Sequence, residues 1–223
     1  MKNNSKVPVF EYLTDARLPV IDIDQNKIIE ILHSLNVNKA HGWDDISVRM
    51  IKTCCDVLAT PLHMIFTNCL VQGIYPSIWK MSNVTPVHKK NSKSEIGNYR
   101  PISLLPVFSK VFEKLIYNAM FSHLIENNLL AHEQSGFKPG DSCVAQLLSI
   151  THEIFQSFDC NPSLEVRGVF LDVSKAFDKV WHDGLLHKIR QLGIDNELLP
   201  LIKSFLSNRK QRVVLNAQML YLE

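Results

Sequence analysis

An acidic residue at the end of an apolar segment is the first place where this sequence suggests chemistry. Asp172 lies near the end of residues 166–173, a nearly continuous apolar run. Such a run predicts a central strand that is buried on both faces or nearly so. A carboxylate at the end of a buried strand is poorly solvated unless a cation meets it. The residues alone leave two partners open for Asp172: a divalent metal ion, or a lysine or arginine side chain.

Positive charge is concentrated in one part of a nearly neutral chain. The sequence has 223 residues and a formal net charge of +2. Between residues 80 and 114 it has two acidic residues and seven basic ones, namely Lys80, Lys89, Lys90, Lys93, Arg100, Lys110 and Lys114. This stretch therefore sums to +5, and the remainder to −3. A local basic stretch is typical of a site that contacts phosphates, and a solvated surface loop would explain it equally well.

The elements that must position these residues are helices and short strands. Residues 83–90 and 99–105 predict a β-hairpin with lysines at its tip, and Pro86 suggests that the first strand is an edge strand. Apolar residues at helical spacing predict helices over residues 24–35, 46–58, 61–71, 107–124, 141–158, 174–192 and 198–206. A final strand is expected over residues 211–216, and an extended lead-in over residues 1–20.

The composition, the spacing of cysteines and histidines, and the N-terminal sequence exclude several classes of protein. Hydrophobic residues make up 46% of the chain and charged residues 21%, which argues against general disorder. The five cysteines and nine histidines lack the spacing of a zinc site or a disulfide framework. The polar N-terminus does not resemble a signal peptide, and no apolar run is long enough to span a bilayer. We expect a soluble, intracellular protein, in the nucleus or the cytoplasm.

The residues around Asp172 resemble a known sequence motif. Residues 170–182, FLDVSKAFDKVWH, closely resemble motif A of the reverse transcriptases of non-LTR retrotransposons. The resemblance implies that Asp172 is catalytic and ligates both Mg²⁺ ions of the complete enzyme. It also implies that Phe177 binds the nucleotide and that its ring excludes a ribose 2′-hydroxyl. The alternative for Phe177 is a core residue of the following helix.

Two further segments resemble nucleotide-binding motifs of the same family. Residues 98–105, NYRPISLL, match the fingers motif in which the residue equivalent to Arg100 contacts the triphosphate of the incoming nucleotide. A planar guanidinium suits this role because it binds phosphate oxygens bidentately. Residues 86–90, PVHKK, resemble the segment upstream, which places Lys89 or Lys90 near the same phosphates.

A third segment resembles the loop that this family associates with template contact. Residues 134–142, QSGFKPGDS, place Lys138 where the family usually has arginine, so Lys138 is the expected template-binding residue. Asp141 stands where a basic residue is common, which weakens a phosphate contact there. Residues 39–46 and 209–216 also resemble family segments, so the resemblance covers most of the chain.

The resemblance implies an α+β fold, namely the fingers and partial palm of a right-hand polymerase, helix-rich with short antiparallel strands. The expected divisions are a lead-in with the first helix over residues 1–38, a fingers region over 39–160 and a partial palm with motif A over 161–223. The aromatic-Ala-Asp-Asp hairpin of the family does not follow Asp172, so we expect a C-terminally truncated polymerase.

The expected function follows from the same resemblance. The complete enzyme would be an RNA-directed DNA polymerase, which adds deoxynucleotides to a primer 3′-hydroxyl by two-metal phosphoryl transfer. Its partners would be an RNA template, a DNA primer and deoxynucleoside triphosphates, with Mg²⁺ as cofactor and no membrane. This chain alone is expected to be inactive, and the alternative is a non-enzymatic remnant that binds nucleic acid.

Overall fold

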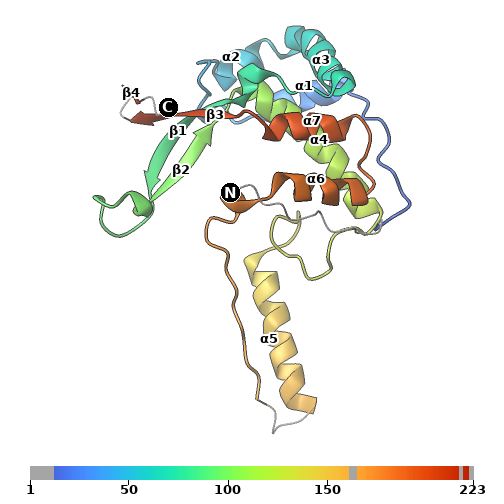
Figure 1. Cartoon of the computed structure of the whole chain (residues 1–223), viewed down its shortest axis with the longest axis vertical. Helices are drawn as coiled ribbons and strands as arrows, with labels where there is room; N and C mark the ends of the chain where they lie inside the picture. The colour runs from blue at the N-terminus through green and yellow to red at the C-terminus, as the bar shows by residue number, and fades with distance from the viewer. Residues whose placement is uncertain (1–12, 161–164, 216–217, 221–223) are drawn as a thin grey trace. The chain divides into compact units, whose positions relative to one another are not determined.

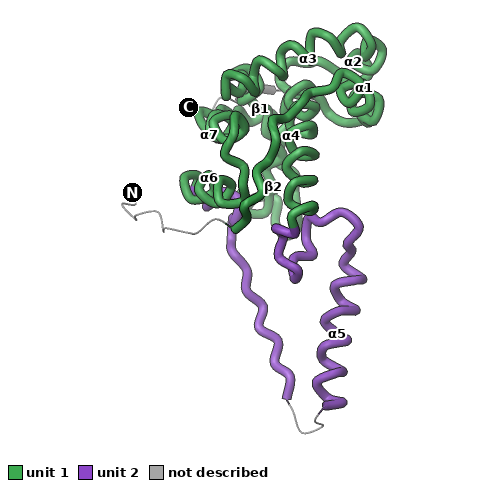
Figure 2. The backbone as a smooth tube through the Cα atoms, turned by 90° about the vertical axis from the view of Figure 1, so that its right-hand side faces the viewer, with its two compact units in different colours: residues 1–127, 182–223 green, residues 128–181 purple. Residues whose placement is uncertain are grey.

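The computed structural model describes residues 13–160, 165–215 and 218–220 (Figure 1). The chain divides into two compact units, and Figure 2 shows them in different colours. Unit 1 comprises residues 1–127 and 182–223, and unit 2 comprises residues 128–181. Helices and one small mixed sheet make up the described part of the chain, which confirms the predicted α+β class. No described helix is both long and apolar enough to cross a membrane.

Three helices open unit 1: α1 (Gln25–Ser34), α2 (Val48–Thr53) and α3 (Cys55–Gln72). The Asp24 carboxylate accepts a hydrogen bond of 2.9 Å from the backbone N–H of Asn26 and caps α1, as predicted. α3 continues through Pro61, so the prediction that a helix starts at this residue is wrong. Proline removes the backbone hydrogen bond to the carbonyl of Val57, and Val57 is exposed, so water can replace that bond.

The sheet has the strand order β2-β1-β3-β4, with bounds Met81–His88 (β1), Tyr99–Leu104 (β2), Lys210–Leu215 (β3) and Gln218–Leu220 (β4). β1 and β2 pair in antiparallel register, which confirms the predicted hairpin. β3 pairs with β4 in antiparallel register, so the expected antiparallel strands are found in two pairs, whereas β1 and β3 pair in parallel register, which was not expected. A parallel pair requires a long crossover connection, and here more than a hundred residues separate the two strands.

Two prolines face each other in the hairpin without breaking it. Pro86 of β1 pairs with Pro101 of β2. The backbone N–H of Lys89 donates to the carbonyl of Asn98 at 2.9 Å, so that pair is a hydrogen-bonded one. Such pairs alternate along an antiparallel ladder, which makes Pro86 and Pro101 a pair that exchanges no hydrogen bonds. Pro86 also lies beyond the segment of β1 that pairs with β3, so it has a strand on one side only.

Three further helices complete unit 1: α4 (Val107–Glu126), α6 (His182–Gln191) and α7 (Leu198–Leu206). An aromatic cluster forms the centre of the core, in which the rings of Phe66 and Phe112 stack with centroids 4.7 Å apart. Tyr75 packs against Phe112, and its hydroxyl donates to the Glu113 carboxylate at 2.8 Å. The core therefore ties α3 and α4 to the segment that leads into the sheet. Two short 3₁₀ helices, η1 (Ser77–Lys80) and η2 (Ile96–Asn98), flank β1 and β2.

Residues 13–24 lead into α1 without forming a helix or strand, and they are hydrogen-bonded to the segment that follows α6; residues 1–12 of the predicted lead-in lie outside the described residues. The N–H of Leu18 donates to the carbonyl of Gly193 at 2.9 Å, and the Asn196 amide donates to the carbonyl of Leu18 at 3.0 Å. Gly193 ends α6 with a φ of 80°, which confirms the predicted helix stop. α7 has the predicted bounds, with Pro200 in its first turn.

The described residues of unit 2 form one long helix, α5 (Cys143–Cys160), and one 3₁₀ helix, η3 (Phe177–Lys179). The Ser142 hydroxyl accepts a hydrogen bond of 3.1 Å from the N–H of Ala145, so Ser142 caps α5, one of the two residues proposed for this role. The predicted buried face of α5 is wrong, since none of its residues is buried. The predicted helix start at Ser174 is also wrong, because residues 174–176 form a turn and α6 begins only at His182.

Candidate nucleotide and nucleic-acid interface

Arg100 and Lys89 lie on one face of the sheet. Alternate residues of a strand point to the same face, and directly paired residues share a face. Arg100 pairs with Val87, and Lys89 follows Val87 by two residues, with its backbone still bonded to Asn98. Lys89 is therefore the lysine on the face of Arg100, whereas Lys90 lies beyond the ladder. Both lysines and Arg100 are exposed.

β3 adds two more basic residues to this face. Arg212 pairs with Asn83 and Lys210 with Met81, and these β1 residues are on the face of Val87. The Nε of Arg212 donates to the Asn83 side-chain oxygen at 2.7 Å, which fixes the guanidinium above β1. Sequence reasoning did not assign Lys210 and Arg212 to the site, because only the parallel register of β1 and β3 brings them beside it. The sequence signal that could have shown them is that Lys210 and Arg212 are two residues apart at the start of the final strand, so both point to the same face.

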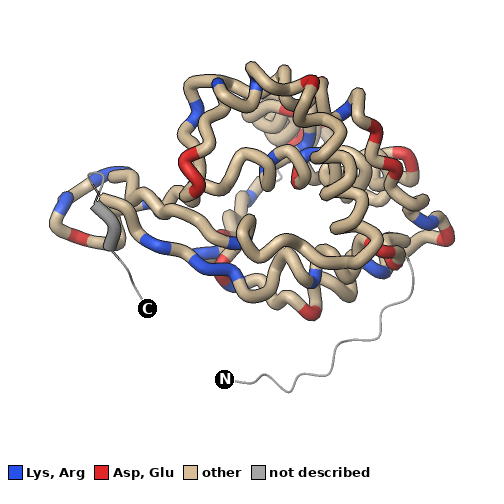
Figure 3. The backbone as a smooth tube through the Cα atoms, turned by 90° about the horizontal axis from the view of Figure 1, so that it is seen from above, with Lys and Arg blue, Asp and Glu red and all other residues tan. Residues whose placement is uncertain are grey.

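We call Lys89, Arg100, Lys210 and Arg212 the basic sheet face. Strands β1, β2 and β3 contain no aspartate or glutamate, so nothing within them neutralises these four charges. Figure 3 marks the basic and acidic residues along the backbone. Cations gathered on one face of an acid-free sheet create a positive potential that attracts phosphate. A guanidinium also has five N–H donors, so Arg212 keeps donors beyond its Nε.

Other lysines of the basic stretch are buried or contact neighbouring side chains. The Lys80 ammonium is buried and donates to the Ser204 hydroxyl at 3.2 Å, and burial lowers its pKa. Burial likewise lowers the pKa of Lys110 on α4. The Lys114 ammonium lies 4.5 Å from the centre of the Tyr117 ring. The basic residues of this stretch thus fall into two groups. Those of the hairpin are free to contact a ligand, whereas Lys80, Lys110 and Lys114 contact other parts of the protein.

Unit 2 contains the other predicted site residues, Lys138, Asp172 and Phe177. The ring of Phe177 lies 6.5 Å from that of Phe137 in an edge-on arrangement, so the segment after Asp172 contacts the loop that carries Lys138. The Phe177 side chain is 82% exposed, and η3 is separate from α6, so the alternative reading as a core residue of a following helix is not supported.

The loop of Lys138 is closed by its own polar contacts. The Asp141 carboxylate accepts from the Ser135 hydroxyl at 2.6 Å and from the N–H of Ser142 at 2.7 Å. These hydrogen bonds, first that of Ser135, lower the pKa of Asp141, and the charge of Lys138 contributes less. Lys138 itself is half-buried. Asp141 thus remains ionised next to Lys138, which reduces the positive potential that this loop offers to a phosphate.

The environment predicted for Asp172 is wrong. Residues 165–173 form no strand, and Phe170 and Leu171 are each 93% exposed. A strand requires a neighbour for its backbone hydrogen bonds, and the described residues provide none here. Asp172 is exposed and has no ion pair within the described chain, so its carboxylate is solvated. One solvated carboxylate holds Mg²⁺ weakly, and Asp172 belongs to no described group of three metal-ligating side chains, so the described residues do not fit a complete magnesium site.

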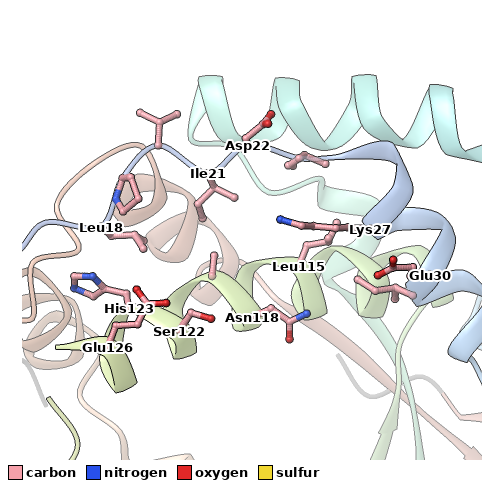
Figure 4. A pocket seen from close by; sticks show the side chains of 15 residues that line it. Leu18, Ile21, Asp22, Lys27, Glu30, Leu115, Asn118, Ser122, His123 and Glu126 are labelled. Carbon is pink, nitrogen blue, oxygen red and sulfur yellow. The ribbon is translucent and has the colours of Figure 1, made fainter. Parts of the chain in front are cut away.

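A cavity of about 560 Å³ lies between the lead-in, α1 and α4 in unit 1 (Figure 4). Its charged lining residues are Asp22, Lys27, Glu30 and Glu126. Three carboxylates against one ammonium disfavour an anionic ligand such as a triphosphate. The basic sheet face is therefore the better candidate for contact with phosphate.

Comparison with known proteins shows the family of the chain. Residues 87–221, more than half of the chain, match the family described as reverse transcriptase (RNA-dependent DNA polymerase). The chain belongs to this family. The matched span begins at residue 87, near the end of β1, and includes β2, β3, Asp172 and all four residues of the basic sheet face.

The curated relatives of this chain come from non-LTR retrotransposons. It is 34% identical over 198 residues to the probable RNA-directed DNA polymerase from transposon BS of Drosophila melanogaster, covering 86% of this chain and 21% of the relative. It is 31% identical over 205 residues to the RNA-directed DNA polymerase from mobile element jockey of the same fly, covering 90% and 22%. The chain thus spans about a fifth of the length of these curated relatives.

Proposed function

We propose that this reverse transcriptase chain binds the phosphates of an incoming nucleotide and of nucleic acid on the basic sheet face. The observation that carries the proposal is the placement of Lys89, Arg100, Lys210 and Arg212 along one face of an acid-free set of strands. Arg100 is the residue proposed for the triphosphate, since its guanidinium can bind two phosphate oxygens at once. Lys89 is proposed to assist it as a point charge.

The reaction proposed for the complete enzyme is RNA-directed DNA synthesis with deoxynucleoside triphosphates. In that enzyme, Asp172 would be one carboxylate ligand of Mg²⁺, with the remaining ligands outside the described residues. Phe177 would exclude the ribose 2′-hydroxyl by the bulk of its ring, and Lys138 would contact the template. The assignment of residues 39–160 to fingers and 161–223 to part of a palm belongs to the same proposal.

A second candidate function is nucleic-acid binding without catalysis. The observation that favours it is the solvated, solitary carboxylate of Asp172, which does not by itself form a metal site. Binding by the basic sheet face would be independent of sequence and would weaken steeply with salt.

Salt-titrated binding of a single-stranded RNA tests the proposed interface. We expect that Arg100→Ala weakens binding. The negative slope of log K against log salt should become less steep by ~0.7, the value for one lost phosphate contact. Lys188→Ala is the matched control, since it removes one exposed charge from α6, away from the sheet. An unchanged slope in Arg100→Ala, or an equal loss in Lys188→Ala, would contradict the proposed interface.

Primer extension separates the two candidate functions. With an RNA template, a DNA primer, deoxynucleotides and Mg²⁺, extension that is lost in Asp172→Asn supports the polymerase, provided that RNA binding is retained. Extension that persists in Asp172→Asn would refute the metal role. Binding without extension by the complete enzyme would support the second candidate, whereas the same result with this chain alone is expected under both. In an active enzyme, Phe177→Val should admit ribonucleotides, and unchanged sugar selectivity would argue against its role as a steric gate.

A further inference from the structure

Three metal-ligating side chains meet where α1 faces α3, away from the basic sheet face. His33 lies in the last turn of α1, and Cys55 and Asp56 form the first turn of α3. Their ligand atoms all lie within 4.8 Å of one another. We propose that His33, Cys55 and Asp56 form a zinc site that joins the two helices. No sequence motif predicts this site, because His33 is 22 residues from Cys55 in the sequence.

The distances between the ligand atoms match those of a tetrahedral zinc site. The Cys55 sulfur lies 3.4 Å from Nε2 of His33 and 3.8 Å from Oδ1 of Asp56. With Zn–S of ~2.3 Å and Zn–N or Zn–O of ~2.0–2.2 Å, two ligands at the tetrahedral angle lie roughly 3.5 Å apart. The two measured distances bracket that value. An ion can therefore enter with small side-chain adjustments, and three protein ligands leave a fourth position for water.

The electrostatics of the cluster also suit a divalent cation. A thiolate and a carboxylate together supply two negative charges, which balance Zn²⁺ when the imidazole is neutral. Both anionic ligands are in the first turn of α3, where the positive end of the helix dipole attracts negative charge. Sulfur and imidazole ligands select zinc over magnesium. This site is thus chemically distinct from the one proposed for Asp172.

The surroundings explain what such a site would do. Cys55 is 4% exposed and belongs to the core, whereas His33 and Asp56 are exposed and open a route for the ion. Ile28 and Leu32 of α1 are buried in the same core cluster as Leu62 of α3. Zinc would fasten two helices that already pack together, and it would stabilise the folded chain because the unfolded chain does not hold the three ligands together.

Cobalt substitution of the full, reduced chain tests the site directly. Co²⁺ bound by a thiolate gives a sulfur-to-cobalt charge-transfer band, which Zn²⁺ should abolish by displacement. We expect that Cys55→Ser removes the band and that His33→Gln and Asp56→Asn weaken metal affinity by more than ~10-fold, since even an outer-shell partner contributes ~10–100-fold. Cys54→Ser is the matched control, because Cys54 is the neighbouring exposed thiol but lies outside the cluster.

The outcomes decide for or against the proposal. It is supported if the band depends on Cys55 and His33 and survives Cys54→Ser, and if Zn²⁺ raises the melting temperature of the unaltered chain but not of His33→Gln. It is overturned if the unaltered chain gives no band, if the band persists in Cys55→Ser, or if Cys54→Ser abolishes it. Should Cys55→Ser fail to fold, the exposed His33→Gln variant decides the question, with circular dichroism of the metal-free protein to confirm its fold.

Discussion

Unit 1 and unit 2 contain similar kinds of residues but bury them very differently. Every buried hydrophobic residue among those described belongs to unit 1. In unit 2, most apolar side chains of α5 and of the segment before Asp172 remain exposed, with Leu147 at 64% and Phe155 at 61%. Local signals suffice to form and cap α5, but burial requires a second surface. Helix formation and core formation are therefore separate properties of this chain.

The largest expected contrast between the units comes from one substitution made in each. Phe112→Ala removes a fully buried ring that stacks on Phe66, and we expect it to lower the free energy of unfolding by ~3–5 kcal/mol. Phe155→Ala truncates an exposed ring of α5 and should change it by no more than ~0.5 kcal/mol. Urea denaturation monitored by tryptophan fluorescence measures both. Equal losses would show that unit 2 contributes to the core.

Two glycines with similar backbones sharpen the comparison. Gly193 has a φ of 80° and Gly140 a φ of 84°, so alanine strains both by ~1–2 kcal/mol. At Gly193 a Cβ would also collide with the carbonyl of Ala16, whereas at Gly140 it would meet no atom within 4 Å. We expect Gly193→Ala to cost ~1–3 kcal/mol more than Gly140→Ala. Equal thermal shifts in the two variants would mean that the lead-in does not pack on Gly193.

Alkaline pH should destabilise unit 1 through Tyr75. Burial, and then the nearby charge of Glu113, raise the pKa of Tyr75 above its ordinary value. Above pH ~10 the unfolded tyrosine loses its proton while the folded one keeps it, so stability falls by ~1.4 kcal/mol per pH unit. Below that pH this contribution is constant. Urea midpoints between pH 9 and 11 should show the fall, and Tyr75→Phe should remove it.

Tyr117→Phe is the matched control for the pH series, because Tyr117 is 41% exposed. The fall with pH should persist in this variant. A fall that survives in Tyr75→Phe instead would assign the alkaline destabilisation to other groups.

The smallest expected effect is confined to unit 2. Ser142→Ala removes the hydroxyl that caps α5, which costs ~1 kcal/mol of local helix stability. Hydrogen exchange of the first turn of α5 should accelerate, while the urea midpoint of the whole chain stays unchanged. A shifted midpoint would show that α5 unfolds together with unit 1.

Local features were predictable from the sequence. The hairpin of β1 and β2, the Asp24 cap and the stop of α6 at Gly193 each depend on a few neighbouring residues. Pro61 was misread because its lost hydrogen bond falls on the solvent side of α3, where it costs little.

Features that depend on distant partners were not predictable. An apolar run such as residues 166–173 indicates a strand only if another strand pairs with it, and periodicity does not supply that partner. The same limit applied to the site: Arg100 was found from its motif, but the place of Arg212 beside Asn83 depends on a register across 129 residues. The cluster of His33 and Cys55 was missed for the same reason.

The parallel pairing of β1 with β3 also has a consequence for synthesis on the ribosome. At ~5–20 residues per second, about 6–26 s pass between the emergence of Val84 and that of its partner Val213. Throughout that interval the nascent chain presents one side of β1 without its neighbour, and α4 without the helices that later cover it. Chaperones that shield unpaired strand edges and apolar helices should therefore engage this polypeptide during translation and leave once β3 has docked.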